Sequence, residues 1–350
     1  MALIGIIANP SSGKDIRRLV ANATCFDNME KVNIIQRILI AFHKLSDARI
    51  LVMDDAYGML EKAAENIRRL THESVNAGLI PFRPVFDQTD STKAARMLRE
   101  LGAKCIIVIG GDGTNRVVAK ACGDVPLIPL STGTNNVFPY MMEGTVAGLA
   151  ALVAETDAGG EMLKTRRCKR LNIYKNGDLA DIALIDVCVT SDMFAASRAV
   201  WNVDSIRELF VTVAKPDSIG MSAIGGSFRT IREHEPLGLY IRCGEPAAFA
   251  TNVAIGPGLI RPVGIKYSRT MAIGDRISLE TGAGMLALDG EREVEFLPKD
   301  RIEIELTRDG PLVVDIPATL SCAADRGFFL IHNTPQGETK GGICIHDSDE

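Results

Sequence analysis

The sequence lacks the features that mark membrane, secreted and nucleic-acid-binding proteins. No apolar run reaches the roughly 18 residues that cross a bilayer, and the residues after Met1 lack the basic flank of a signal peptide. The 8 cysteines include no C-x-x-C pair and the 5 histidines show no ligand spacing, so we expect neither a zinc site nor a disulfide framework. The net charge of −5 offers no electrostatic footprint for DNA or RNA. We therefore expect a cytoplasmic protein that binds neither a membrane nor nucleic acid.

Two common nucleotide-binding motifs are also missing. No G-x-G-x-x-G fingerprint follows the first expected strand, which argues against a Rossmann dehydrogenase. The loop of residues 9–14 is not a Walker A loop, because Ala8 stands where its first glycine belongs and Asp15 follows Lys14 in place of Ser or Thr.

What is present in the first part of the chain is an alternation of short β-branched runs with long amphipathic stretches. This pattern is typical of βαβ units around a parallel sheet. The expected strands are residues 3–8, 49–53, 105–109 and 127–130. The expected helices are residues 32–45, 59–70, 90–101 and 145–155, with the cap of the third at Asp90, Ser91 and Thr92.

From about residue 169 the pattern changes to strand segments joined by hairpin signals, namely Asn176-Gly177, Asp289-Gly290 and Asp309-Gly310. A helix is expected near residues 191–210. Because 350 residues exceed one compact core, we expect two domains. The fold class is an α/β N-terminal domain with a parallel sheet, followed by a β-rich, antiparallel, sandwich-like C-terminal domain. The expected divisions are a nucleotide-phosphate-binding domain at 1–145, a linker helix and junction at 146–168, an acceptor-binding domain at 169–320, and a C-terminal segment at 321–350 that returns to the first domain.

The stretch I-G-G-D-G-T-N at residues 109–115 follows an apolar strand. Its glycines would permit positive φ angles and leave room for a phosphate against bare N–H groups at a helix N-terminus. Asp112 is unexpected beside a phosphate unless Mg²⁺ lies between them or the carboxylate accepts a proton from an attacking hydroxyl. The alternative is a simple strand-to-helix turn in which Asp112 caps the helix.

Two further polar, glycine-containing loops follow strands at the same expected sheet edge, where ligands of parallel sheets bind. One is Asn9-Pro10-Ser11-Ser12-Gly13-Lys14, and the other is Ser131-Thr132-Gly133-Thr134-Asn135-Asn136. Asparagine amides both donate and accept hydrogen bonds, which suits a ribose, a base or a phosphate. Three such loops at one edge favour a phosphate-binding site over a set of turns.

Together, N-P-x-x-G, G-G-D-G-T and the G-T-N-N loop resemble the superfamily of NAD kinases and diacylglycerol or sphingoid lipid kinases. The segments A-N-P-S-S-G-K and S-T-G-T-N-N-V-F-P are most similar to those of the ATP-NAD kinase-like family, including its acetoin-catabolism protein X group. The resemblance implies an ATP- and Mg²⁺-dependent kinase with an NAD kinase-like fold. It also makes a homo-oligomer the expected state.

Residue by residue, the resemblance gives Asp112 the role of activating the acceptor hydroxyl or holding Mg²⁺. It implies that the surrounding residues bind the nucleotide: Asn9, Ser11, Ser12, Gly13, Lys14, Gly110, Gly111, Gly113, Thr114, Thr134, Asn135 and Asn136.

Two acids of the second domain are further candidates. NAD kinases carry an Asn-Glu or Asn-Asp pair that binds the dinucleotide; the nearest match is Ile185-Asp186, in which Ile185 replaces the asparagine. Leu288-Asp289-Gly290-Glu291 resembles the D-G-E segment of the lipid kinases, although Asp-Gly is also a common hairpin turn. Asp186 and Glu291 are therefore both expected near the bound ligands.

The function implied is ATP-dependent phosphoryl transfer to a hydroxyl of a small molecule, with NAD as the leading acceptor. Two alternatives stay open: a lipid or polyol kinase, and a catalytically silent nucleotide-sensing regulator. The run from Lys164 to Arg170 could face a substrate phosphate or lie in solvent.

Overall fold

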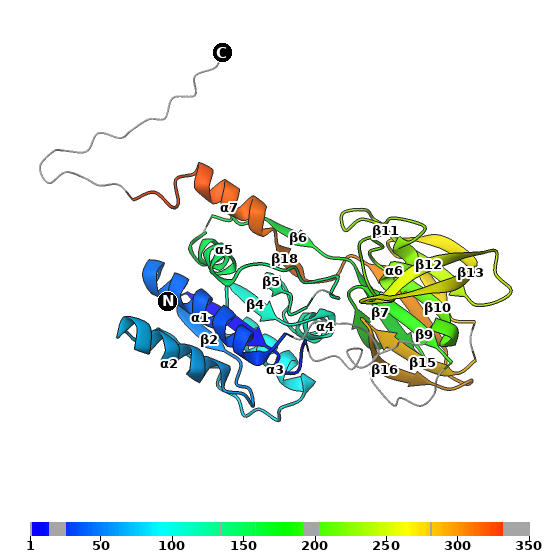
Figure 1. The fold of residues 1–350 in the computed structure, drawn as a ribbon, viewed down its shortest axis with the longest axis horizontal. Coiled ribbons are helices and arrows are strands. Elements are labelled where there is room, and N and C mark those ends of the chain that lie inside the picture. The colour runs from blue at the N-terminus through cyan, green and yellow to red at the C-terminus, as the bar shows by residue number, and fades with distance from the viewer. Residues whose placement is uncertain are drawn as a thin grey trace, which may run out of the picture.

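The computed structural model describes residues 2–13, 26–133, 135–157, 159–191, 203–280 and 282–331. Over these ranges the chain forms an α/β half and a β half, which lie side by side with α4 (Asp112–Ala119) between them (Figure 1). Among the helices in these ranges, none combines the length and apolar character needed to cross a membrane.

The α/β half is built on a 7-stranded sheet of order β3-β2-β1-β4-β5-β18-β6. Its first five strands are parallel, and a helix joins each strand to the strand that follows it in the chain. The elements up to the junction are β1 (Leu3–Ala8), α1 (Asn28–Leu45), β2 (Arg49–Val52), α2 (Met59–Thr71), β3 (Ala77–Leu79), α3 (Gln88–Glu100), β4 (Cys105–Ile109), α4, β5 (Leu127–Leu130) and α5 (Gly144–Thr156).

Apolar residues of the helices cover both faces of this sheet. All residues of β1 and β4 are buried, as expected for parallel strands covered by helices on both sides. One core lies under α1, α2 and α5, and a second lies under α3 and α4. Gly5 permits the close approach of α3, because a β-carbon there would lie 2.3 Å from Cδ1 of Leu98.

The chain crosses between the halves twice. β6 (Thr165–Arg167) leads out of the first sheet, and β18 (Leu312–Val314) returns to it beside β5, followed by α7 (Ile316–Asp325), which packs on α5. The helix expected to be a linker, α5, packs on α1 of the first half. The chain returns to the first sheet at residue 312, before the expected position of 321. We therefore propose that the α/β half comprises residues up to 167 together with 312–325.

The β half contains two antiparallel sheets. A 7-stranded sheet has the order β12-β13-β11-β10-β9-β15-β16, and a 4-stranded sheet has the order β14-β17-β7-β8. The elements are β7 (Arg170–Lys175), β8 (Asp178–Ala183), β9 (Asp186–Thr190), the 3₁₀ turn η2 (Val203–Ser205), β10 (Ile206–Val211), α6 (Ser222–Gly226), β11 (Leu237–Cys243), β12 (Phe249–Gly256), β13 (Leu259–Ala272), β14 (Arg276–Ser278), β15 (Gly284–Leu288), β16 (Glu291–Phe296) and β17 (Ile302–Thr307).

The two sheets of the β half face each other across an apolar core. Leu171 and Ile304 of the smaller sheet belong to the same buried cluster as Val187, Phe210 and Leu286 of the larger sheet. The other face of the larger sheet is covered by α6. The expected fold class, a parallel α/β half followed by an antiparallel β half, is confirmed.

Three local expectations are wrong. Asp87, not Asp90, caps α3, and the Asp90 carboxylate instead accepts hydrogen bonds from the amides of Val85 and Phe86. Residues 206–211 form strand β10 in place of the end of a helix, while residues 192–202 lie outside the described ranges. Asp309-Gly310 is not a hairpin turn, because β17 and β18 belong to different sheets. Amides four and five residues before Asp90 decide the first case, whereas the pairing of strands that are distant in the sequence overrides the local signal in the other two.

Candidate functional site

The three polar loops meet at the carboxyl edge of the first sheet. They follow β1, β4 and β5, which are adjacent and parallel. The amide Nδ2 of Asn9 donates to Oγ1 of Thr114 over 2.9 Å, and Oγ1 of Thr132 donates to Oγ of Ser12 over 3.1 Å. Side-chain hydrogen bonds therefore join the first loop to both of the others.

The loop after β5 is folded around Asn136. Its Nδ2 donates to Oγ of Ser131 over 2.8 Å, and its Oδ1 lies against Gly111, where a β-carbon would approach it to 2.7 Å. Gly13, with a φ of 72°, approaches the same loop closely, since a β-carbon there would lie 2.9 Å from the carbonyl oxygen of Thr132. These two glycines are thus required for the loops to fit together.

Asp112 links α4 to the loop after β5. Its carboxylate accepts hydrogen bonds from the backbone amides of Val137, at 3.1 Å, and Phe138, at 2.8 Å. The N-cap of α4 is Gly111, without a side-chain hydrogen bond, so Asp112 does not cap its own helix. The side chain remains half-buried at the first turn of α4, where helix N–H groups lack intrahelical partners.

A buried lysine lies beneath the first loop. Lys31 of α1 is 0% exposed, and its Nζ donates to the carbonyl oxygens of Asn9, at 2.8 Å, and Ser12, at 2.7 Å, and to Oδ1 of Asn28. An ammonium group has three donors, and these acceptors match that number. Lys31 therefore fixes the backbone of the loop and brings a positive charge close to it.

We expect Lys31→Met to lower the free energy of unfolding by about 2 kcal/mol, because the partly buried carbonyl oxygens of Asn9 and Ser12 would lose their charged donor. Urea unfolding measures the loss. The control is Lys44→Met on the same helix, whose side chain is 60% exposed, and which should change stability by less than about 0.5 kcal/mol. Equal effects of the two substitutions would contradict the role of Lys31.

The β half reaches this site through the hairpin of β15 and β16. Residues 289 and 290 form its turn, as the Asp-Gly signal predicts, and Glu291 begins the returning strand. Glu291 lies next to Gly113 of α4: a β-carbon on Gly113 would be 2.9 Å from its Oε1 and 3.0 Å from its Cδ. The structure thus brings Glu291 to the G-G-D-G-T segment from the other half of the chain.

Asp289, in the turn of the same hairpin, binds backbone amides of the β half, whereas Glu291 lies against Gly113 of α4. Its carboxylate is buried and accepts hydrogen bonds from the backbone amides of Leu184, Ile185 and Asp186, the shortest being 2.7 Å. Burial raises the pKa of Asp289, and nearby Arg116 and the three amides oppose this effect. Asp289 therefore fastens the hairpin to the start of β9.

We expect Gly113→Ala to slow any reaction at this site while changing stability by less than about 1 kcal/mol. The new methyl group must displace the flexible Glu291 side chain, and misplacing a group at a reaction centre can cost roughly 10²-fold in rate. Steady-state kinetics and urea unfolding measure the two effects. Gly282→Ala is the matched control, because a β-carbon there meets nothing within 4 Å. Unchanged kinetics of Gly113→Ala would show that this contact is unimportant.

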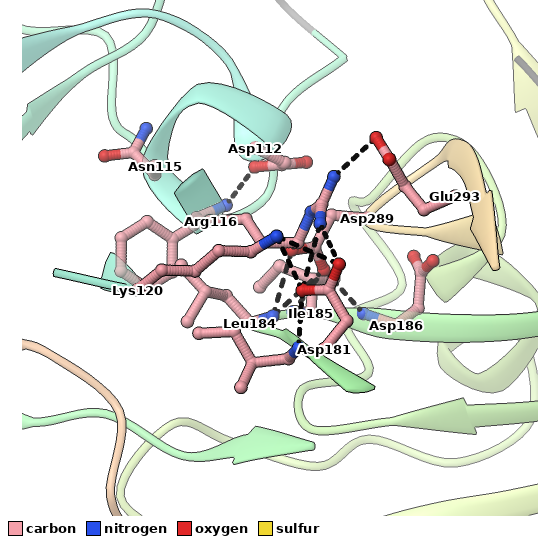
Figure 2. Close-up of polar contacts among 12 residues, drawn as sticks. Asp112, Asn115, Arg116, Lys120, Asp181, Leu184, Ile185, Asp186, Asp289 and Glu293 are labelled. Carbon is pink, nitrogen blue, oxygen red and sulfur yellow. Dashed lines mark hydrogen bonds and ion pairs between the residues drawn. The ribbon is translucent and has the colours of Figure 1, made fainter. Parts of the chain in front are cut away.

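Arg116 joins the two halves. Its guanidinium is 0% exposed and faces three acids of the β half: NH2 lies 2.8 Å from Glu293, NH1 3.3 Å from Asp181, and Nε 3.9 Å from Asp289 (Figure 2). Burial lowers the pKa of Arg116, but these acids and Glu291 outweigh that effect and raise it. Since Arg116 lies one helical turn after Asp112, this ion cluster fixes α4 directly against the β half.

The remaining candidate residues take varied positions. Asp186 is buried at the start of β9, and its amide donates to Asp289 over 3.1 Å, so it lies beside the interdomain acids (Figure 2). Asn135 is half-buried and Ser11 exposed in their loops. Lys14 and Thr134 lie outside the described residues.

The basic run between Lys164 and Arg170 is divided between different environments. Lys169 is 3% exposed and donates to the carbonyl oxygens of Arg232 and Leu237, whereas Lys164 is exposed. Arg166 pairs with Glu233 at 2.8 Å. The run is therefore neither wholly solvated nor part of the three-loop site.

Sequence reasoning missed Lys31 and Arg116. A signal exists for each: Lys31 has the helical spacing of the core residues Ile35 and Ile38, and Arg116 is four residues after Asp112. A charged residue at a core position of a helix indicates a buried partner. Apart from Asn28, which lies on the same helix as Lys31, the partners are distant in the sequence and cannot be found from it.

Comparison with known proteins extends this description. Residues 4–158 match the family model of the ATP-NAD kinase N-terminal domain, and residues 169–309 match that of the acetoin catabolism protein X C-terminal domain. Acetoin catabolism protein X of Cupriavidus necator is 34% identical over 348 residues, which cover 97% of this chain and 96% of that protein. The chain belongs to the acetoin catabolism protein X family.

The resemblance expected from the loop motifs is thereby confirmed, both for the family and for its acetoin catabolism protein X group. Among solved structures, yeast NADH kinase complexed with NADH aligns with 97% of this chain and 90% of its own, at 13% identity and a TM-score of 0.46.

Proposed function

We propose that this member of the acetoin catabolism protein X family is an ATP-dependent kinase that phosphorylates a hydroxyl of a small molecule, with NAD as the leading acceptor. The observation that carries the proposal is the convergence of the three loops, held together by the Asn9–Thr114 and Ser12–Thr132 hydrogen bonds. The ATP-NAD kinase N-terminal domain match covers all three loops. The NADH in the yeast NADH kinase structure belongs to that protein, and NAD remains a proposal for this one.

The phosphates of the donor would lie against Gly111, Gly113 and the first turn of α4. Glycines let a phosphate approach the backbone, and the helix N-terminus favours negative charge. Lys31 adds a positive charge beneath the neighbouring loop. Binding of a triphosphate at this place is therefore supported by the positive charge of the helix N-terminus and of Lys31, and it would require the side chains of Asn136 and Glu291, which lie against Gly111 and Gly113, to move aside.

Asp112 would accept the proton of the acceptor hydroxyl. Its carboxylate is held in place by the amides of Val137 and Phe138, and a carboxylate with two oxygens has further lone pairs for a third partner. Phosphoryl transfer needs mainly positioning and charge neutralisation, so a rigidly held carboxylate suits this role. Glu291, next to Gly113, would be the second acid near the reacting groups.

The residues present fit a magnesium ion that travels with the nucleotide. Over the described ranges, no three side chains of His, Cys, Asp or Glu are grouped as metal ligands. Mg²⁺ commonly takes one or two carboxylates together with phosphate oxygens and waters. As the alternative to its role as the base, Asp112 would be that carboxylate, and a magnesium ion held there would supply positive charge for the phosphates.

The decisive experiment is a transfer assay of the purified protein with ATP and Mg²⁺ against NAD, NADH, glycerol and diacylglycerol. Phosphorylation of NAD, identified by its product, supports the proposal. Transfer to glycerol or diacylglycerol alone would replace NAD by a polyol or lipid acceptor.

A catalytically silent nucleotide-sensing regulator is the second candidate. It is favoured by the fact that Asp112 has a structural task, the fastening of the loop at Val137 and Phe138, which would preserve this residue without turnover. Binding of ATP in calorimetry, with no transfer to any acceptor, would support this function and contradict the kinase.

A further inference from the structure

A cavity of about 500 Å³ lies at the edge of the first sheet opposite to the three loops. Its wall includes Lys120 after the end of α4, Asp124 before the start of β5, Arg167 at the end of β6, and Pro311 before the start of β18. β5 and β18 are parallel and begin at this edge. The cavity is therefore separated from the three-loop site by the length of the strands and of α4.

Positive charge dominates the wall of this cavity. Five cationic side chains contribute to it, and the acids among the lining residues are only Asp124 and Asp309. The cationic residues are Arg99, Lys120, Arg167, Arg170 and Arg308. This concentration contrasts with the whole chain, whose net charge is −5.

Only some of these cations are neutralised within the protein. Arg167 pairs with Asp124 and Lys120 pairs with Asp181, each at 2.7 Å. Among the residues that the structure describes, Arg170 and Arg308 form no ion pair. The cavity therefore holds uncompensated positive charge.

The hydrogen bonds of Arg170 and Arg308 leave donors available. Nε of Arg170 donates to Oδ1 of Asn172 over 2.8 Å, and NH2 of Arg308 donates to the carbonyl oxygens of His234 and Glu235 over 3.1 Å. A guanidinium has five N–H donors, so each side chain retains several for a ligand.

Arg308 also acts on the neighbouring Lys169. Burial lowers the pKa of Lys169 to about 8; Arg308 lowers it as well, whereas Glu235 and Glu233 oppose both effects. Arg308 is therefore close enough to Lys169 for the two positive charges to repel each other.

We propose that this cavity binds a small molecule with two or more linked phosphate groups, at a site distinct from the three loops. An arginine guanidinium group can donate two parallel hydrogen bonds to two oxygens of one phosphate group, and a ligand with several phosphate groups would neutralise Arg170 and Arg308 together. A cavity of about 500 Å³ has the size of small-molecule sites. Lys120 lines the cavity and pairs with Asp181, which also pairs with Arg116. An anion bound in the cavity would therefore lie next to the ion cluster that joins the two halves.

Calorimetry with pyrophosphate on the full chain tests the proposal. The double substitution Arg170→Gln/Arg308→Gln should weaken one binding event by about 10²-fold, since each lost charge-assisted hydrogen bond accounts for roughly 10-fold. The exposed Arg99→Gln should weaken the same event by a few-fold. Arg68→Gln, an exposed arginine on α2, is the matched control and should leave it unchanged.

The outcomes separate this cavity from the three-loop site. Loss of binding in the double variant but not in Gly113→Ala supports the proposal, whether or not the protein is a kinase. Absence of pyrophosphate binding in the unmodified protein, or equal binding by the double variant when urea unfolding shows that it is folded, overturns it. Comparison of ADP with pyrophosphate then distinguishes a nucleotide from an inorganic polyphosphate as the ligand.

Discussion

Asp112→Asn is expected to lower the turnover of phosphoryl transfer by about 10²-fold or more while the protein stays folded. Asparagine has the shape of aspartate and keeps one side-chain oxygen, so it can still accept a hydrogen bond from Phe138 or Val137. It cannot take a proton from the acceptor hydroxyl. The loss in stability should be limited to about 1 kcal/mol, the value of one hydrogen bond.

The measurement is the turnover number with ATP, Mg²⁺ and the acceptor found in the transfer assay, together with urea unfolding of each variant. Asp47→Asn is the control, because Asp47 is an exposed acid far along the chain from the three loops. Equal turnover of the unmodified protein and Asp112→Asn would exclude Asp112 as the base. A fall in turnover that is matched by unfolding would assign it a structural role only.

Arg116→Met is expected to reduce the free energy of unfolding by about 3–5 kcal/mol at pH 7. The substitution keeps an apolar stem of similar length but leaves Asp181, Asp289 and Glu293 without their buried cation. Removing one partner of a buried ion cluster costs more than the cluster itself contributes, because the remaining charges stay desolvated.

The free energy of unfolding that Arg116→Met loses should grow as the pH rises. Burial already raises the pKa of Asp289 in the native protein, and removal of Arg116, which opposes that effect, should raise it further. An acid whose pKa is higher in the folded than in the unfolded state stabilises the fold below its unfolded pKa, and this contribution is lost as the pH rises through its folded pKa. Arg116→Met should therefore be closer to the unmodified protein at pH 5 than at pH 8.

Urea unfolding at both pH values measures this dependence. Lys120→Met is the control, since its side chain is 31% exposed and the remaining Asp181 carboxylate still faces Arg116. It should cost about 1 kcal/mol or less. A pH-independent loss in Arg116→Met would show that lost packing, not the unpaired acids, causes the destabilisation.

Local patterns account for the parts of the fold that the sequence predicted well. The strands Leu3–Ala8, Cys105–Ile109 and Leu127–Leu130 have the expected bounds, because continuous β-branched runs are buried on both faces of a parallel sheet. The hairpin at Asn176-Gly177 also formed, since both residues adopt the positive φ angles that this turn requires. In these cases the determining interactions lie within a few residues of each other.

The candidate site was predictable as a set of loops but not as a set of contacts. The order of strands in a parallel sheet places the ends of β1, β4 and β5 together, so the meeting of their loops follows from the topology. The attachment of Asp112 to Val137 and Phe138 does not follow, because it depends on how the loop after β5 turns back toward α4.

By itself, the sequence determined the glycine-rich turn from β4 into α4 at residues 109–115 and the division into an α/β and a β half, because glycine spacing and strand periodicity are local properties. Only the tertiary structure decided that Glu291 reaches Gly113 and that Arg116 gathers Asp181, Asp289 and Glu293. Those contacts join residues from different halves of the chain. Ion pairing inside a folded protein depends on burial and distance, and neither quantity exists until the two halves have packed together.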